Sequence, residues 1–556
     1  MCGIFCLFDL PAGQSGAARE VALQQARLLR HRGPDWSGVW AGERAVMAHE
    51  RLSIVDVLHG AQPLRSADGN LVLAVNGEIY NHLELRRELG PHVPFQTDSD
   101  CEVILPLYAS EGPGLVQRLR GMFAFALHDA TNGDWLIARD PVGIIPLYMG
   151  RRADGSLAVA SEMKALLAVC ESIEEFPPGH VMSRRDAAPV RYWSRDWFEF
   201  DQVPDRAVSP ATIRDALAES VHSHLMTDVP YGVLLSGGLD SSVIGVLAAR
   251  YASRRVESGD AEAAWWPRLH SYAIGLPGSP DLAAARRAAE AIGTVHHGFE
   301  FTVQEGLDAL RDVIWHIESF DTTTVRASTP MYLLARRIRA TGVKMVLSGE
   351  GSDEIFGGYL YFHKAPSARA FHEELVRKLQ LLHLYDCLRA NKSMAAWGIE
   401  ARVPFLDTRF LDVAMRVPSR QKLVAPGGME KQILREAFRG ELPEEILWRQ
   451  KEQFSDGVGY AWIDSLKAHA AVRVSDRELS LAAERFPVGT PLTKESYLYR
   501  GLFEELFPHP SAAACVPCGP SVACSSPEAL AWDPSFAGNA DPSGRAVKGV
   551  HRDAVG

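Results

Sequence analysis

The sequence predicts an α/β protein of two domains, a layered strand-rich domain followed by a parallel doubly wound one. Three observations lead to this prediction. The 556 residues exceed what one hydrophobic core usually covers. Short strand-like runs dominate residues 1–200. From about residue 210, helical and strand patterns alternate, which favours parallel strands covered by helices on both faces.

The first domain is placed at residues 1–205. Turn signals such as "ADGN" and "TNGD" separate its strand-like runs. Helices are expected over residues 16–30 and 82–90, and Ser99 and Asp100 are candidate caps for a third. Strands and helices in one unit predict stacked sheets with helices outside. The strand-like runs cover residues 3–10, 44–57, 70–77, 121–129, 134–140 and 156–163.

The second domain is placed at residues 206–510, after a change of pattern near 198–210. Residues 511–556 are rich in Pro, Ala, Ser and Gly, and we expect a tail that is irregular and either draped over the surface or mobile. The expected helices cover residues 210–225, 239–253 and 279–293, and the expected strands cover 231–238, 269–276, 295–301 and 343–349.

Composition excludes several classes of function. Lys and Arg number 58 against 69 Asp and Glu, a formal net charge of −11, which argues against non-specific binding to nucleic acid or to an anionic membrane. We see neither an apolar run of about 18 residues nor a secretory pattern at the start. The eight sparse cysteines are typical of reduced thiols, and "CVPC" at 515–518 lacks a second ligand pair for zinc. We therefore expect a cytoplasmic protein.

Cys2 is the first candidate for chemistry. Removal of the initiator methionine would leave a thiol and a free α-amine on one residue. Typical pKa values of about 8.5 and about 8 let the amine deprotonate the thiol near neutrality. An isolated Cys2 would more often be a buried, inert cysteine.

Neighbouring motifs favour a nucleophile. "NG" at 76–77 can supply a side-chain amide and an open backbone N–H for an oxyanion, although NG is more often a hairpin turn. Arg51 and Asp100 can bind the carboxylate and ammonium of an α-amino acid, although each could be a surface charge. Together with Cys2 these residues predict a glutamine site.

The run "YGVLLSGGLDSS" at 231–242 predicts a phosphate site. A buried strand ends in Ser-Gly-Gly and a helix starts within a few residues, so free backbone N–H groups meet the positive helix end. The alternative is an ordinary capped turn. The run matches neither of the common glycine-rich nucleotide loops, which makes kinases, GTPases and dehydrogenases poor candidates.

The run "VLSGEGSDEIFGGY" at 346–359 repeats this arrangement and adds carboxylates. Glu350, Asp353 and Glu354 would repel a triphosphate unless Mg²⁺ bridges them or one acts as a base. The alternative is a helix-start acidic cluster stabilised by the dipole. Arg449 and Lys451 are cations that could reach the same pocket.

These motifs, with "MCGIF", "HRGPDWSG", "AHERLSIVD", "NGEIYNH" and "RQKEQFSDG", resemble the bacterial B-type family of glutamine-hydrolysing asparagine synthetases over essentially the whole chain. The resemblance implies an N-terminal-nucleophile αββα glutaminase domain and an ATP-pyrophosphatase domain with a five-stranded parallel core. It implies that ATP activates L-aspartate as β-aspartyl-AMP, which ammonia from L-glutamine converts to asparagine. It also implies Mg²⁺ and a homodimer.

The resemblance assigns roles residue by residue. Cys2 is the implied nucleophile, with Asn76 and Gly77 as the oxyanion hole, and Glu350 and Lys451 act on the adenylate and on ammonia attack. Asp240 and Asp353 are implied metal ligands. The implied glutamine-binding residues are Arg51, Leu52, Ser53, Ile54, Val55, Asn76, Gly77, Glu78 and Asp100, and the implied ATP-binding residues are Leu234, Ser236, Gly237, Gly238, Asp240, Ser241, Ile274, Ser348 and Gly349.

Two other readings stay open. Another glutamine-dependent amidotransferase could adenylate a different carboxylate, and only the acid substrate would distinguish it. A non-catalytic regulator could keep the fold, but it would need neither Cys2 nor Lys451. Cys6 is expected to be a packed bystander. We also expect ammonia to travel through a sheltered, mostly apolar passage along the domain interface.

Overall fold

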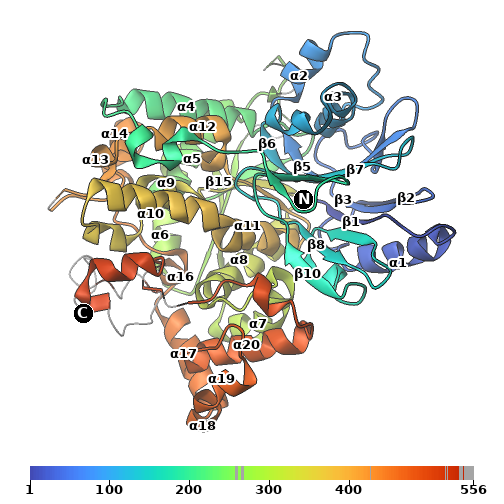
Figure 1. The fold of residues 1–556 in the computed structure, drawn as a ribbon. Coiled ribbons are helices and arrows are strands. Elements are labelled where there is room, and N and C mark those ends of the chain that lie inside the picture. The colour runs from blue at the N-terminus through green and yellow to red at the C-terminus, as the bar shows by residue number, and fades with distance from the viewer. Residues whose placement is uncertain are drawn as a thin grey trace.

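The computed structural model describes residues 1–536 with gaps at 257–258, 260, 265–267, 426, 520 and 523, and also residues 543 and 547. Figure 1 shows two packed domains, with the blue-to-teal strands on one side and the green-to-orange helices on the other. No helix of these described residues is long and apolar enough to cross a membrane.

The first domain stacks two antiparallel sheets with helices against them. The strand orders are β10-β8-β9-β1-β3-β2 and β12-β11-β7-β6-β5-β4. The strands are β1 Gly3–Phe8, β2 Trp36–Ala41, β3 Val46–Arg51, β4 Leu64–Arg65, β5 Leu71–Ile79, β6 Gly121–Asp129, β7 Trp135–Arg139, β8 Tyr148–Arg151, β9 Leu157–Ala160, β10 Ser172–Glu175, β11 His180–Ser183 and β12 Val190–Arg191, and the helices are α1 Ser15–Arg27, α2 His82–Leu89 and α3 Ile104–Glu111.

Strand β5 shows why these sequences form two layers. Side chains alternate between the two faces of a strand. Val72 and Ala74 accordingly join the main core, whereas Leu73 and Val75 join a second apolar cluster. That second cluster also contains Leu107 of α3. The αββα layering expected from the sequence is therefore confirmed.

The described second domain contains a five-stranded sheet in the order β15-β14-β13-β16-β17, and all its pairings are parallel. Its strands are β13 Tyr231–Leu234, β14 His270–Gly275, β15 Val295–Glu300, β16 Met345–Leu347 and β17 Glu400–Arg402. The strand order reverses between β13 and β16, and ligands of such sheets bind where that crevice opens at the carboxyl ends. Both glycine-containing motifs follow these two strands.

Helices cover this sheet and continue beyond it. The helices that follow the strands near the crevice, α5 and α6, are 13 residues each. The helices are α4 Pro210–Ser223, α5 Leu239–Tyr251, α6 Pro280–Ile292, α7 Val303–Ile317, α8 Thr322–Ala340, α9 Ser352–Phe356, α10 Ala368–Leu381, α11 Asp386–Ala395, α12 Thr408–Met415, α13 Ser419–Lys422, α14 Gln432–Ala437, α15 Glu444–Leu447, α16 Phe454–Gly457, α17 Ala461–Arg473, α18 Asp476–Ser480, α19 Ala482–Arg485 and α20 Lys494–Leu506.

One expectation about capping is wrong. The third helical segment begins with a 3₁₀ turn at Asp100–Val103, and the Ser99 side chain makes no capping bond there. The Asp100 carboxylate instead accepts a hydrogen bond from the backbone N–H of Ile79, at 2.6 Å. A strand distant in sequence therefore takes the group that would otherwise cap the helix.

The described part of the tail is draped over the second domain and also contacts β10 of the first, where Cys515 Sγ lies 3.9 Å from the carbonyl oxygen of Ile173. It forms short 3₁₀ turns at Ala513–Cys515, Glu528–Trp532 and Pro534–Phe536. Val522 and Phe536 are buried. The remaining tail residues of this expectation lie outside the described residues.

Candidate functional site

Cys2 lies directly before β1 and is held on all sides. Its backbone N–H donates to Asn76 Oδ1 at 2.7 Å, and its carbonyl oxygen accepts from Arg32 Nε at 2.9 Å. Its Sγ lies 3.4 Å from the backbone nitrogen of Leu52. Burial raises the pKa of the Cys2 thiol, so the site needs a base to generate the thiolate. The thiol is thus fixed in place but protonated when left alone.

Asn76 and Gly77 offer hydrogen-bond donors beside that thiol. The Asn76 amide uses its oxygen for the backbone of Cys2, while its buried Nδ2 finds no partner among the described residues. Gly77 has φ of 146°, and a Cβ there would lie 2.1 Å from the carbonyl oxygen of Met122. Only glycine fits this position. A buried donor without a hydrogen bond, such as Asn76 Nδ2, costs free energy, and a substrate oxygen that accepts from it would remove this cost.

The other predicted glutamine-binding residues surround the thiol. Arg51 donates to the carbonyl oxygens of Val55 and Asp56 at 3.2 and 2.6 Å, so it shapes the loop after β3. Leu52, Ser53 and Ile54 of that loop are buried. The structure therefore brings this loop and Cys2 together.

Two buried carboxylates complete this site. Glu78 pairs with Arg402 of β17 at 3.1 Å, a contact from the second domain that the sequence did not predict. Burial raises the pKa of Glu78, and Glu400 adds to the effect. Burial also raises the pKa of Asp100. Although Arg402 already lies beside Glu78, the net shift of both carboxyl groups favours the protonated form, and the ammonium of a bound amino acid would favour the ionised form.

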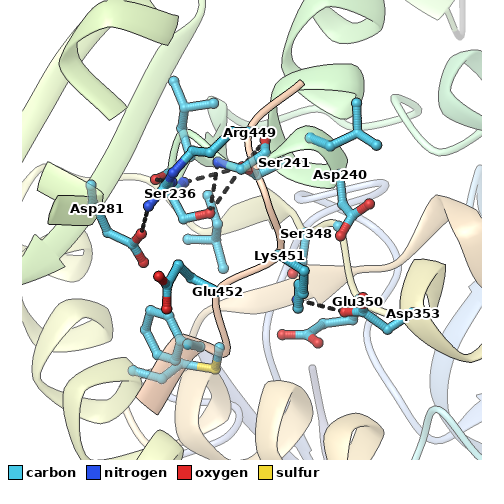
Figure 2. A pocket seen from close by; sticks show the side chains of 18 of the residues that line it. Ser236, Asp240, Ser241, Asp281, Ser348, Glu350, Asp353, Arg449, Lys451 and Glu452 are labelled. Atoms are coloured by element: carbon cyan, nitrogen blue, oxygen red, sulfur yellow. Dashed lines mark hydrogen bonds and ion pairs between the residues drawn. The ribbon is translucent and has the colours of Figure 1, made fainter. Parts of the chain in front are cut away.

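The second site is a pocket at the carboxyl ends of β13, β14 and β16 (Figure 2). Of the residues expected at the nucleotide, all except Gly237 line it. Gly237 has φ of 73°, and a Cβ there would lie 2.3 Å from the carbonyl carbon of Ala284 in α6. It therefore shapes the loop from behind. The lining residues from that set are Leu234, Ser236, Gly238, Asp240, Ser241, Ile274, Ser348 and Gly349.

Hydrogen bonds close the loop between β13 and α5. The Ser241 hydroxyl lies 3.2 Å from the backbone nitrogen of Ser236 and 3.1 Å from its hydroxyl. Arg449 lies across the loop and pairs with Asp281 at 2.7 Å, as Figure 2 shows. The N-terminal end of α5 faces the pocket, where its dipole favours negative charge.

Charged side chains meet at one edge of this pocket. Lys431 Nζ lies 2.6 Å from both Asp240 Oδ2 and Asp353 Oδ1, and Lys451 Nζ lies 2.6 Å from Asp353 Oδ2. Burial alone would raise the pKa of Asp353, but the two lysines outweigh it and hold the pKa well below its usual range. Burial lowers the pKa of Lys451, but the neighbouring Asp353 carboxylate raises it by more, so the pKa lies above the usual range of a lysine. Asp353 and Lys451 are therefore both charged at neutral pH.

Glu350 and Glu354 differ from Asp353. Glu350 accepts from Arg389 of α11 at 2.7 Å, and burial raises its pKa. Glu354 faces Tyr359 and does not line the pocket. Burial and Asp386 raise the pKa of Glu354 to about 8. Glu350 and Asp353 therefore line the pocket, whereas Glu354 does not, although it is close enough for Asp353 to raise its pKa.

Sequence reasoning missed Lys431 and its support. The carboxylate of buried Glu430 accepts from the backbone N–H of Lys451 at 2.9 Å and from Arg435 at 2.7 Å, which connects both lysine-bearing segments. Lys431 itself has φ of 60°, rare for a side chain of its size. No recognisable motif surrounds Lys431 or Glu430. The sequence shows the charge of each residue but not that the two lie at this pocket.

A second cavity adjoins the first and shares Asp353, Lys451 and Phe454 with it. Charges of both signs line it, from Asp321, Lys378, Asp386 and Arg389. Tail residues Cys518, Ser521 and Cys524 are also part of its wall. The tail thus covers a charged pocket next to the pocket at the ends of β13, β14 and β16.

Comparison with known proteins assigns a family to each of the two parts of the chain. Residues 1–176 match a glutamine amidotransferase domain, and residues 212–371 and 366–518 match an asparagine synthase domain. The chain is 62% identical over 554 residues to "Asparagine synthetase B [glutamine-hydrolyzing]" of Escherichia coli (strain K12), covering 100% of both chains. It is 53% identical over 560 residues to "Asparagine synthetase [glutamine-hydrolyzing]" of Asparagus officinalis, covering 100% of this chain and 94% of that one.

The fold and the two sites define a two-domain glutamine amidotransferase that uses ATP. Within that class, the chain belongs to the family of glutamine-hydrolysing asparagine synthetases. The family resemblance drawn from the sequence motifs is confirmed.

Proposed function

We propose that this enzyme makes L-asparagine from L-aspartate and ATP, using ammonia that its first domain releases from L-glutamine. The observation that carries the proposal is that one chain holds a buried thiol beside an unpartnered amide donor and, in its other domain, a phosphate-type loop facing paired lysines and carboxylates. The full-length match to glutamine-hydrolysing asparagine synthetases supports it.

In the first domain, Cys2 attacks the glutamine amide to form a glutamyl thioester and release ammonia, and water then hydrolyses the thioester to glutamate and the free thiol. The α-amine of Cys2, exposed by removal of Met1, takes the thiol proton. Asn76 Nδ2 and the backbone N–H of Gly77 stabilise the oxyanion, and Arg51 through Val55, Glu78 and Asp100 bind glutamine. Ammonia then moves along the domain interface through a sheltered, mostly apolar passage to the second site.

In the second domain, the β-carboxylate of aspartate attacks the α-phosphorus of ATP and pyrophosphate leaves. Ser236, Gly238 and Ser241 hold the pyrophosphate, and Leu234, Ile274, Ser348 and Gly349 contact the nucleotide. The cations of Lys431 and Lys451 offset the charge that develops on the phosphates. Ammonia displaces AMP from the acyl-adenylate, with Glu350 positioned to accept its proton. The adjoining cavity, with charges of both signs, suits aspartate.

Asp240 and Asp353 are the residues that would hold Mg²⁺. One oxygen of each lies 2.6 Å from the Lys431 ammonium, so the two carboxylates already converge around a cation. Carboxylate oxygens are ligands that Mg²⁺ prefers, and the residues therefore fit the ion. Bound there, Mg²⁺ would neutralise phosphate charge. We further propose that the protein is cytoplasmic, as its sparse cysteines favour, and that it is a homodimer, as the family resemblance implies.

The test is a product assay. Purified protein supplied with aspartate, Mg·ATP and either glutamine or an ammonium salt should yield asparagine, AMP and pyrophosphate, and glutamate only with glutamine. NMR with ¹⁵N-labelled donors identifies the product and chromatography quantifies AMP. Absence of AMP with aspartate, but its formation with another acid, would show a different amidotransferase.

Asp240→Asn should lower ATP-dependent synthesis by at least about 10-fold with either nitrogen donor, because one carboxylate of the cation site loses its charge. Glutamine hydrolysis should stay at the wild-type rate, since Asp240 lies in the other domain. The measurement is AMP release beside glutamate release. Asp308→Asn on the exposed side of α7 is the control and should change neither rate. A matching loss of glutaminase activity in Asp240→Asn would contradict the assignment.

A further inference from the structure

Arg32 is a fully buried guanidinium that uses each of its three nitrogens. Nε donates to the carbonyl oxygen of Cys2 at 2.9 Å, Nη1 to Glu162 at 2.7 Å, and Nη2 to Asn391 Oδ1 at 2.8 Å. Cys2 and Glu162 belong to the first domain, but Asn391 lies on α11 of the second. The Arg32 guanidinium, which holds the backbone of Cys2, is therefore itself held at one nitrogen by Asn391 of the second domain.

Asn391 is itself fixed on both sides. Its Nδ2 donates to the carbonyl oxygen of Ile144 at 3.1 Å, which orients its Oδ1 toward Arg32. The next residue, Lys392, donates to Glu318 at 2.6 Å and to the Tyr148 hydroxyl at 2.9 Å. Polar bonds to both domains therefore fix this part of α11, and the side chains involved are buried.

The same carboxylate that holds Lys392 also binds the first domain. Glu318 accepts from the backbone N–H groups of Met163 and Lys164 at 2.9 and 2.7 Å. Lys164 pairs with Glu162 at 2.6 Å, and Glu162 in turn holds Arg32. The network is closed, so a shift of α11 would reach Arg32 through Asn391 directly and through Glu162 indirectly.

The N-terminal part of α11 faces the second active site. Arg389, two residues before Asn391, donates to Glu350 at 2.7 Å and pairs with Asp386 at 2.6 Å. One helix thus carries a contact to the acyl-activation pocket and a contact to the support of the thiol.

We propose that Asn391 of the synthetase domain is a positioning residue for glutamine hydrolysis, acting through Arg32 on the backbone of Cys2. This inference rests on the proposed glutaminase function of Cys2. Asn391 touches no reacting atom. It keeps Arg32 in the orientation that holds the Cys2 carbonyl, while Asn76 holds the Cys2 nitrogen, and the two together set where the thiol points.

The experiment measures glutamate release without ATP or aspartate for Asn391→Leu, which keeps the volume but removes the acceptor. We expect kcat for glutamine hydrolysis to fall up to about 100-fold with a small change in KM, since misplacement of a reacting group affects the chemical step. Inactivation by 6-diazo-5-oxo-L-norleucine, which alkylates the thiol, should slow in parallel. Synthesis from ammonium salts should continue, because the second site is intact.

Two further variants separate positioning from folding. Asn391→Asp keeps an oxygen acceptor for Arg32 and should restore most of the glutaminase rate. Ser393→Ala, on the same helix and equally buried, removes a hydroxyl that has no partner among the described residues and should leave both activities unchanged. If Asn391→Leu gives no folded protein, Asn391→Ser, whose hydroxyl is too short to reach Arg32, makes the same test.

The outcomes are distinct. Wild-type glutaminase kcat and thiol alkylation in a folded Asn391→Leu, or an Asn391→Asp variant as slow as Asn391→Leu, would overturn the inference while leaving the proposed function intact. A wild-type enzyme that releases no glutamate from glutamine would instead refute the proposed function itself.

Discussion

Replacing Cys2 by alanine should lower the rate of asparagine synthesis from glutamine by at least about 10³-fold, while synthesis from ammonium salts continues. The thiol is the only part of Cys2 that changes, and the backbone bonds to Asn76 and Arg32 do not depend on it. The pocket at the ends of β13, β14 and β16 lies in the other domain and keeps its lysines and carboxylates. Initial rates of asparagine and AMP formation with each nitrogen donor measure the effect.

Cys6→Ala is the matched control for Cys2→Ala. Cys6 lies on β1, the strand that directly follows Cys2, is fully buried, and has its thiol pKa raised by burial. Because Cys6 only packs in the core, the Cys6→Ala enzyme should retain both activities. Loss of both activities in a folded Cys2→Ala protein would contradict the picture of two separate sites, and survival of the glutamine reaction would exclude Cys2 as the nucleophile.

Lys422→Met should raise the melting temperature, most strongly at or below pH 7. The Lys422 side chain is buried, with its ammonium 3.8 Å from Met415 Sδ and 5.7 Å from the centre of the Phe356 ring. Burial lowers the pKa of Lys422 to about 7. At about 1.4 kcal/mol per pKa unit, a native pKa that low implies an upper limit of about 5 kcal/mol gained by removing the charge.

The sign of the pH dependence follows from linkage. Below pH 7 the lysine is charged in both states, so the folded protein bears the full cost of the buried charge. Between pH 7 and its ordinary pKa, the unfolded chain binds the proton more than the folded protein does, and stability rises with pH. The gain from Lys422→Met should therefore be largest near pH 6 and small near pH 10.

Scanning fluorimetry at pH 6 and pH 9.5 measures this difference between the two pH values. Lys494→Met is the control, since Lys494 is partly exposed and pairs with Asp476 on the surface. It should leave the melting temperature nearly unchanged at both pH values. A Lys422→Met protein that melts at or below the wild-type temperature at pH 6 would show that the ammonium is solvated or paired in solution.

Local patterns predicted most of the fold. Residues 71–79 and 121–129 have the apolar composition of buried strands, and they pair over their whole length. The alternation of helix and strand after residue 210 predicted the parallel sheet, and the glycines of both motifs lie where its order reverses. These features depend on residues close together in the chain, which is why the sequence reveals them.

The missed features are contacts between distant residues. Lys431 reaches Asp240 across 191 positions, and Arg32 reaches Asn391 across 359. Neither lysine nor asparagine has a neighbouring pattern that marks it. The cap expected at Asp100 was wrong for the same reason, because Ile79 of β5 takes its carboxylate. A single sequence shows which groups are available but not which of them meet.

The position of Met1 has a consequence for how the enzyme matures. Met1 is 1% exposed, and its ammonium lies 3.4 Å from Glu400 of the second domain. A peptidase has no access to a residue enclosed in this way. If Cys2 works with a free α-amine, the first peptide bond must be cut on the nascent chain, before the two halves close on each other. Molecules whose two domains pack together before Met1 is removed would then persist as a population that uses ammonium salts but does not hydrolyse glutamine.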